Sequence, residues 1–284
     1  MKTPRFLWIL LFLFTCSTIS EAEELSAMSF NIRYGKAKDG DNAWPHRKEL
    51  VAETIQRFSP DLLGLQESLD FQVDFLAKQL PEFEVYSVPR TPDGGESCAI
   101  FFRKSRFEKL DEGTFWLSET PDQVASKSWD SSLPRIVSWV RLQDRKNDRE
   151  LFFANTHFDH RGTIAREMSA KLIRKRLPEL AGSTPFLLTG DFNCIDGSPP
   201  QEALLGDDGK FLDTYREIHP EIAAGKEGTF TGFQATDNGK RIDWILCSPG
   251  FTIESAAIDR FRKNGRVPSD HYPVTTVLRF AEKK

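Results

Sequence analysis

Phe186-Leu187-Leu188-Thr189-Gly190-Asp191-Phe192-Asn193 is an apolar run that ends in a carboxylate and an amide. Residues 186–189 have the composition of a short buried strand, and the Gly- and Pro-rich stretch that follows predicts a loop. A simple turn would also explain Gly190, Asp191 and Asn193, because all three residue types suit turns. The same order, an apolar run followed by polar side chains, recurs along the chain, and this recurrence favours a shared site.

Polar side chains stand at the ends of several other predicted strands. They are Asn31, Glu67, the series Asn155, His157 and Asp159, then Asp243 inside the apolar run 242–247, and finally Asp270 with His271. Each has an ordinary explanation alone: a helix cap for Glu67, a hydrogen-bonded structural role for His157, a plain loop for Asp270 and His271. Strands that deliver carboxylates, amides and imidazoles to their ends build one cleft in an α/β protein, so the set as a whole predicts an active site.

Strands are predicted along the whole chain, and helices at only three places. Apolar residues recur at helical spacing in 50–58, 71–80 and 163–177. Alternating or continuous apolar runs predict strands at 28–32, 62–66, 83–88, 98–103, 136–142, 151–156, 186–189, 242–247, 251–258 and 274–280. This pattern indicates an α/β protein in which two sheets pack together in one domain, with helices on the outer faces.

Six short motifs carry a resemblance to a known family. They are Ser29-Phe30-Asn31-Ile32-Arg33, Gln66-Glu67, Asn155-Thr156-His157-Phe158-Asp159, Gly190-Asp191-Phe192-Asn193, Arg241-Ile242-Asp243-Trp244 and Ser269-Asp270-His271-Tyr272-Pro273. In this order they resemble the endonuclease/exonuclease/phosphatase superfamily, over about residues 25–280. The segments 113–118 and 159–162 are similar to a secreted bacterial branch of it. The resemblance implies a deoxyribonuclease-I-like fold, a four-layer α/β/β/α sandwich of two mixed sheets flanked by helices.

The resemblance also implies a metal site. Glu67 corresponds to the main ligand of Mg²⁺, for which Mn²⁺ can substitute, and Asn31 and Asp270 assist it. Mg²⁺ prefers oxygen ligands and usually takes only one or two protein carboxylates. Some relatives carry a second acidic residue two positions after the first-strand Asn; here that position is Arg33, which weakens the case for a second metal.

The catalytic residues implied by the resemblance are His157, Asp191, Asn193, Asp243 and His271. Asp191 corresponds to the group that positions or deprotonates the attacking water, and Asn193 to one that orients the phosphate. Asp243 and His271 resemble a buried pair in which the carboxylate fixes the imidazole, so that His271 donates to phosphoryl oxygens. His157 is expected to supply a second donor.

Four further residues are candidates for substrate binding: Arg33, Arg135, Asp159 and Arg161. The arginines suit bidentate contact with phosphate, although a surface or structural role is equally open for each. Asp159, with its neighbour His160, is expected to hydrogen-bond sugar or polyol hydroxyls.

The N-terminus has the composition of a signal peptide. Lys2 and Arg5 precede the apolar run 6–14, and Ser20-Glu21-Ala22 supplies small residues for cleavage. We expect residues 1–22 to be this signal and residues 23–284 to be the single catalytic domain, secreted or periplasmic and without stable membrane insertion after cleavage. A retained N-terminal anchor is the alternative.

The net charge and the cysteine content limit the classes of function that the protein can have. Loss of residues 1–22 removes Lys2, Arg5 and Glu21 and so lowers the formal charge from −4 to −5, which gives no general attraction to nucleic acid or anionic lipid. Cys98, Cys194 and Cys247 are widely spaced, which excludes a disulfide scaffold. The leading hypothesis is a phosphoester hydrolase acting on a phosphorylated small molecule or lipid head group. An extracellular nuclease and a catalytically inactive binding module are the alternatives, and the oligomeric state stays open.

Overall fold

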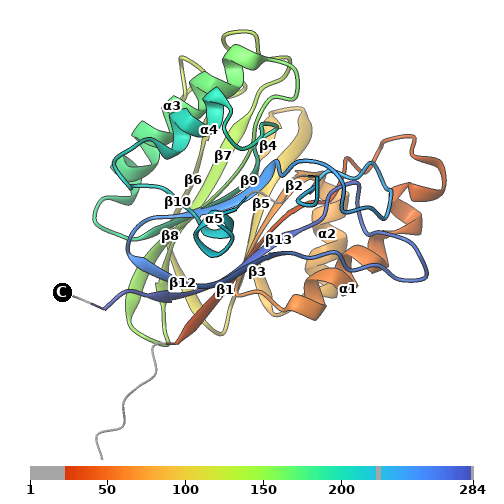
Figure 1. Cartoon of the computed structure of the whole chain (residues 1–284), viewed down its shortest axis with the longest axis horizontal. Coiled ribbons are helices and arrows are strands. Elements are labelled where there is room, and N and C mark those ends of the chain that lie inside the picture. The colour runs from red at the N-terminus through yellow and green to blue at the C-terminus, as the bar shows by residue number, and fades with distance from the viewer. Residues whose placement is uncertain (1–22, 222–224, 283–284) are drawn as a thin grey trace, which may run out of the picture.

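Two β-sheets lie face to face, and helices cover the outer face of each, in the computed structural model of the chain (Figure 1). The structure describes residues 23–221 and 225–282. Helices α1 and α2 lie on one side of the paired sheets, and α3 and α4 lie on the other. The described chain therefore has the four layers α/β/β/α, which confirms the predicted fold class.

The first sheet has the strand order β12-β13-β1-β2-β5-β3, and β4 pairs with β5. Its neighbours β1 and β2 are parallel, and its other pairs are antiparallel. The strands are β1 (Glu24–Asn31), β2 (Leu62–Ser68), β3 (Phe83–Tyr86), β4 (Pro89–Thr91), β5 (Gly94–Arg103), β12 (Phe251–Ile258) and β13 (Val274–Phe280), and the covering helices are α1 (Lys48–Phe58) and α2 (Asp70–Gln79).

The second sheet has the strand order β10-β11-β9-β8-β7-β6, in which only the pair β8 and β9 is parallel. Its strands are β6 (Phe107–Trp116), β7 (Ile136–Asp144), β8 (Arg149–His157), β9 (Phe186–Asp191), β10 (Leu212–Asp213) and β11 (Asp243–Cys247). The helices are α3 (Thr163–Ala181), α4 (Pro199–Leu205) and the short α5 (Thr214–Ile218). Each sheet is thus built around one parallel pair joined by a helix, α1 in the first and α3 in the second.

Alternation along the strands divides the core into three apolar layers. On β5, Ile100 and Phe102 face the other sheet, whereas Phe101 faces α1 and α2. On β8, Phe153 lies between the sheets and Phe152 packs under α3. Because both faces of these strands are covered, their sequences are continuously apolar, as buried strands require.

A buried polar network joins the two sheets below the cleft. Asn155 on β8 donates from Nδ2 to the carbonyl oxygens of Leu65 (2.8 Å) and Ala99 (3.0 Å), and its Oδ1 accepts from Gln66 Nε2 (2.6 Å) and Thr189 Oγ1 (3.1 Å). Gly64 permits this close approach, since a Cβ there would lie 2.1 Å from Thr189 Oγ1. The network fixes the ends of β2, β8 and β9 relative to one another.

Several elements differ from the sequence-based expectation, among them the short strands β4 and β10, which were not predicted. Strand β6 was not predicted, because its middle carries the charged residues Glu108, Lys109, Asp111 and Glu112 and shows no apolar pattern. It forms at the edge of the sheet by pairing with β7. Helices α4 and α5 were also missed, since at 7 and 5 residues they are too short to show a helical period. Helix α3 continues four residues beyond the predicted end, to Ala181.

The predictions for the N-terminus and for the cysteines can be compared with the structure only in part. The expected signal peptide, residues 1–22, lies outside the described residues. Within the described ranges, none of the helices combines the length and apolar character needed to cross a membrane. Cys98, Cys194 and Cys247 are buried free thiols, as expected for a protein that is not a disulfide scaffold.

Candidate active site

Five strands bring the predicted residues to one edge of the paired sheets. In the first sheet Asn31, at the end of β1, pairs with Gln66 on β2, and Glu67 follows. In the second sheet Asp191, at the end of β9, lies between His157 of β8 and Asp243 of β11. Parallel neighbours end at the same edge, and the antiparallel strand β11 begins there, so residues that are distant in the sequence meet at this edge.

A cavity of about 440 Å³ opens at this edge. Eight of the predicted residues line it: Arg33, Glu67, Arg135, His157, Asp191, Asn193, Asp270 and His271. Asn31 and Asp243 lie directly beneath, 0% and 1% exposed, and contact the lining side chains. The predicted catalytic and metal-binding residues therefore form one site.

Asp191 is the centre of this arrangement. Its Oδ1 accepts from the backbone N–H of Asn193 (2.9 Å), and its Oδ2 accepts from Asn31 Nδ2 (2.9 Å). Both histidines approach the same Oδ2, with His157 Nε2 at 3.4 Å and His271 Nε2 at 3.7 Å. Burial, followed by the charge of Asp243, raises the pKa of Asp191, as expected for a group that takes up a proton.

His271 is paired with Asp243. His271 Nδ1 lies 2.9 Å from Asp243 Oδ2, and both side chains are almost fully buried. Burial alone lowers the pKa of His271, but the charges of Asp243 and Asp191 outweigh it and raise that pKa well above its ordinary value. The hydrogen bond at Nδ1 leaves Nε2–H as the donor on the side of the cavity, as predicted for this pair.

His157 has the opposite electrostatic environment. Burial and then the charge of Arg135 lower its pKa well below the ordinary value. Asn193 Nδ2 lies 3.0 Å from His157 Nε2 and 3.1 Å from the carbonyl oxygen of Phe158. The carbonyl oxygen can only accept, so the atom of Asn193 that faces it is the amide nitrogen. That nitrogen also donates to His157, and Nε2 of a neutral His157 is therefore the acceptor. The proton of His157 is therefore on Nδ1, which hydrogen-bonds to none of the described residues. Its Nε2 accepts from Asn193 and so orients that side chain.

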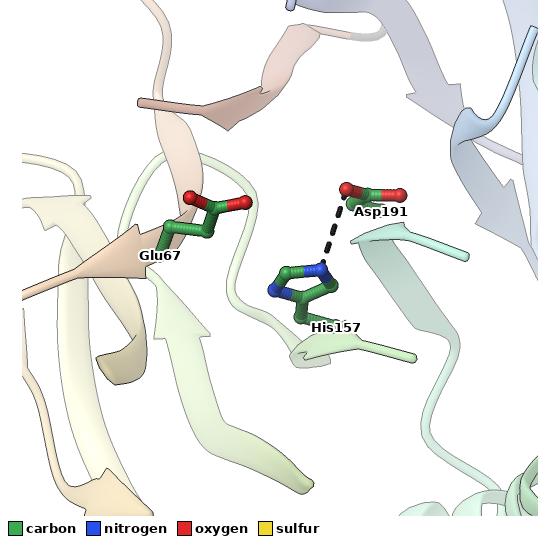
Figure 2. A group of neighbouring side chains, drawn as sticks. All are labelled: Glu67, His157 and Asp191. Carbon is green, nitrogen blue, oxygen red and sulfur yellow. Dashed lines mark ion pairs between the residues drawn. The ribbon is translucent and has the colours of Figure 1, made fainter. Parts of the chain in front are cut away.

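Carboxylates from both sheets face the cavity and suit a hard cation. Figure 2 shows Glu67, His157 and Asp191 converging from β2, β8 and β9. Ligand atoms of these three lie within 4.8 Å of one another, and Asp270 lines the same cavity. Burial raises the pKa of Asp270, and the charge of Glu67 adds to this effect. A divalent cation would offset this concentration of buried negative charge, so the donor set fits one.

Asn31 contacts both carboxylates beside the predicted metal site. Its Nδ2 donates to Glu67 Oε1 (3.1 Å) and Asp191 Oδ2 (2.9 Å), and its Oδ1 accepts from the backbone N–H of Arg33 (2.9 Å). With both amide atoms used in this way, Asn31 holds the two carboxylates in place. Asp191 and His157 bring their own potential ligand atoms close to those of Glu67.

The backbone of the site is held in an uncommon conformation. Arg33, Glu67 and Asn193 have φ values of 61°, 60° and 48°, in the left-handed region that side chains other than glycine rarely adopt. Glu67 Oε2 accepts from the backbone N–H of Tyr34 (2.6 Å), which links two of these strained segments. Strain of this kind persists where surrounding contacts enforce it, and it clusters at functional sites.

A buried arginine that was not among the predicted site residues helps to hold the strained backbone at Arg33 in place. Arg47, 2% exposed, donates to the carbonyl oxygens of Ile32 (2.7 Å), Arg33 (3.2 Å), Asn42 (2.9 Å) and Pro268 (3.2 Å). It thereby ties the segment after β1 to the segment that carries Asp270. Sequence reasoning missed it, because a single Arg in a helix N-terminus has no distinguishing pattern.

The predicted substrate-binding residues divide into two groups. Arg33 and Arg135 line the cavity, although Arg33 is also paired with Asp39 at 3.0 Å. Arg161 is exposed and does not line it. Asp159 is 1% exposed, and its carboxylate accepts from Ser132 Oγ and from the backbone N–H groups of Arg161 and Gly162. Asp159 therefore shapes the loop instead of offering oxygens to a substrate.

Several cavity residues were not among the predicted site residues. They are Tyr34, Ala37, Glu96, Leu133, His160, Phe230 and Ile242. Glu96 and Phe230 lie in segments without any recognisable motif, so only the packing of the strands places them here. His160 stands beside Asp159 in the sequence, and the structure shows that it, and not Asp159, faces the cavity.

The comparisons with known proteins agree with this geometry. Residues 28–271 match the model of the Endonuclease/Exonuclease/phosphatase family. Nocturnin from Drosophila melanogaster is 26% identical, and the alignment covers 91% of this chain but only 46% of that protein, so the chain spans less than half the length of this curated relative.

Two solved structures from Bacteroides thetaiotaomicron are each 33% identical to the chain. One is an endonuclease/exonuclease/phosphatase family protein (TM-score 0.83, covering 92% of this chain and 100% of that one). The other is described as a mannosyl-6-phosphatase (TM-score 0.82, covering 90% and 100%). The matched region contains every strand end that builds the cavity, and the chain therefore belongs to the endonuclease/exonuclease/phosphatase family and is a phosphoester hydrolase.

Proposed function

We propose that the protein is a secreted or periplasmic, Mg²⁺-dependent phosphomonoesterase that acts on a small phosphorylated compound or a lipid head group. The observation that carries this proposal is the single cavity of about 440 Å³ in which Asp191, His271 and Glu67 meet. This volume lies within the range of about 300–1,000 Å³ that is typical of small-molecule sites. The likeness to a protein described as a mannosyl-6-phosphatase supports the same substrate class.

Asp191 is the base in this proposal. Its Oδ2 lines the site between the two histidines, and its raised pKa suits it to accept the proton of the attacking water. The backbone N–H of Asn193 and the amide of Asn31 hold the carboxylate in one orientation. Asn193 uses its two Nδ2 hydrogens on His157 Nε2 and the Phe158 carbonyl, so its remaining polar atom is Oδ1, an acceptor that suits the attacking water.

His271 stabilises the charge that develops on the phosphoryl oxygens. Its Nδ1 is engaged by Asp243, so the Nε2–H is directed away from that carboxylate and toward the phosphate. A fixed donor of this kind is worth most in a partly dehydrated cavity. Arg33, which follows β1, and Arg135, which precedes β7, add positive charge to the walls.

Glu67 and Asp270 would hold Mg²⁺, with Asp191 close enough to share it. When bound, the cation supplies charge neutralisation at the phosphoryl group and aids departure of the leaving oxygen. Oxygen ligands in this number favour Mg²⁺ or Mn²⁺ over zinc.

The cellular location rests on the sequence alone. Lys2, Arg5, the apolar run 6–14 and the small residues near Ala22 support export from the cytoplasm. Outside the cytoplasm, small phosphate esters are a plausible source of phosphate. Detection of a mature N-terminus near residue 23 in the periplasm or culture medium would support this part of the proposal, and an intact Met1 terminus in the cytoplasm would contradict it.

A substrate panel tests the reaction. Specificity constants for sugar phosphates, inositol phosphates, phosphodiesters and oligonucleotides are measured with Mg²⁺ and with excess chelator, at low and at moderate salt. We expect small monoesters to exceed nucleic acid in both salts, because nuclease affinity depends on many phosphate contacts to Lys and Arg. Dominant oligonucleotide cleavage that falls steeply with salt would replace this proposal with the extracellular nuclease.

A further inference from the structure

A second polar cluster lies in the same cavity, beside the reacting groups. Glu96 on β5, Arg135 just before β7 and His160 after β8 line one part of the wall next to His157. Glu96 and His160 take no part in the chemistry proposed above, and Arg135 contributes only positive charge to the wall. Their role is therefore to be sought in the part of the substrate that is not transferred.

The cluster is rigidly built. Arg90 Nη1 donates to Glu96 Oε2 at 2.6 Å, and the carbonyl of Arg90 is held by Trp116 Nε1 at 2.8 Å. Arg135, 4% exposed, donates from Nη2 to His160 Nδ1 at 3.0 Å, and its Nε lies 3.5 Å from Asp159 Oδ2. Asp159 thus acts on the cavity indirectly, by holding Arg135.

Each member keeps one polar atom unused. Among the described residues, nothing hydrogen-bonds Glu96 Oε1, and the nearest carboxylate to Arg135 Nη1 in an ion pair is Glu96, at 3.9 Å. Because His160 Nδ1 accepts from Arg135, the ring is neutral and its Nε2–H remains free. Burial and then the charge of Arg135 lower the pKa of His160, in agreement with a neutral ring.

Glu96 offers an acceptor, and Arg135 and His160 offer donors, which is a combination that suits the hydroxyl groups of a ligand. A hydroxyl donates one hydrogen bond and accepts others, so it can satisfy Glu96 and a neighbouring donor together. A second phosphate only accepts, and the carboxylate of Glu96 would repel it. Phe230, 51% exposed and packed edge-on against His271 at 5.1 Å, adds an apolar surface for the carbon face of a ring.

We propose that Glu96, Arg135 and His160 form a hydroxyl-binding subsite that selects phosphomonoesters of polyols, such as hexose phosphates. This inference rests on the proposed phosphomonoesterase function and names the substrate class of that site. A site that hydrogen-bonds the hydroxyls of its substrate rejects analogues without them, because the polar groups that the analogue covers would stay unpaired.

The test compares two substrates in one variant. Glu96→Gln keeps the size of the side chain and an oxygen for Arg90 but removes the charge, and Glu119→Gln, at an exposed position, is the matched control. With Mg²⁺ present, we expect Glu96→Gln to lower kcat/KM for a hexose 6-phosphate by about 10- to 150-fold, the range for a hydrogen bond to a charged group. Turnover of p-nitrophenyl phosphate, which has no hydroxyl to bind, should stay within about threefold of wild type. Equal losses on both substrates, or no loss on either, would overturn the subsite.

A binding measurement separates this inference from the proposed function. Calorimetry on the Asp191→Asn protein with Mg²⁺, which prevents turnover, compares a hexose 6-phosphate with inorganic phosphate. We expect the sugar phosphate to bind at least tenfold more tightly, and the added Glu96→Gln change to remove most of this difference. Equal affinities would overturn the subsite whatever the activity. Tighter sugar-phosphate binding by an enzyme that hydrolyses no monoester would retain the subsite and reject the monoesterase.

Discussion

Replacing Asp243 by asparagine removes the charge from the buried pair that Asp243 forms with His271 and leaves the size of the side chain almost unchanged. In the protein, Asp243 Oδ2 accepts from His271 Nδ1 at 2.9 Å, and the side chains are 1% and 5% exposed. If this bond orients the imidazole and favours its protonated form, Asp243→Asn should slow the reaction without unfolding the protein. The effect should depend entirely on the presence of His271.

The magnitude follows from the geometry of the pair. A hydrogen bond to a charged group contributes about 1.5–3 kcal/mol, and each 1.36 kcal/mol in the barrier changes the rate tenfold. Asp243→Asn should therefore lower kcat by about 10- to 150-fold. His271→Ala removes the donor itself, and losses of about 10²–10³ are typical for one such donor. Residues that act as a unit are not additive, so the double variant should be within about threefold of His271→Ala.

The assay is steady-state hydrolysis of a phosphomonoester at saturating Mg²⁺, with circular dichroism and thermal melts to confirm the fold. Asp207→Asn, at an exposed position, is the matched control and should retain wild-type kcat. The reasoning is refuted if the two single losses multiply in the double variant. It is equally refuted if Asp243→Asn retains full activity while His271→Ala does not, because the carboxylate would then have no part in orienting the imidazole.

Two further predictions address the metal and the joint between the sheets. Excess chelator should abolish turnover and Mg²⁺ or Mn²⁺ should restore it, and Glu67→Gln should need more metal than wild type; a wild-type metal requirement in that variant would remove Glu67 from the metal site. Asn155→Ala deletes three buried hydrogen bonds to the other sheet and a fourth from Thr189 in its own sheet, and the partners Gln66 and Thr189 keep other contacts. At about 0.5–1.5 kcal/mol for each of the four bonds, the substitution should lower the free energy of unfolding by about 2–6 kcal/mol in urea titrations. Asn238→Ala, at an exposed position, should change it by under about 0.5 kcal/mol, and a similarly small change for Asn155→Ala would contradict the role of the network.

Much of the fold and of the reacting groups follows from local sequence. The apolar run that precedes Asp191 must be buried as a strand, and Asp191 and Asn193 must then stand at its end. The same argument places Glu67 and His157, and the resemblance assigned the roles of the reacting groups. Strand β6 escaped this argument, since its charged residues pair with β7 at an exposed edge and leave no apolar alternation.

The orientation of side chains at the site was decided by the tertiary structure. Two neighbours in the sequence have different orientations here. The carboxylate of Asp159 accepts hydrogen bonds from backbone N–H groups of its own loop, whereas His160 faces the cavity. Asn31 turns its amide nitrogen to Glu67 and Asp191, and Asn193 fixes which nitrogen of His157 accepts. The sequence by itself determined which chemical groups the strands carry to their ends, because burial of apolar runs is a local property. The packing of two sheets determined which atoms those groups present, and added Glu96 and Arg47, because such contacts join residues that are distant in the chain and depend on strand register.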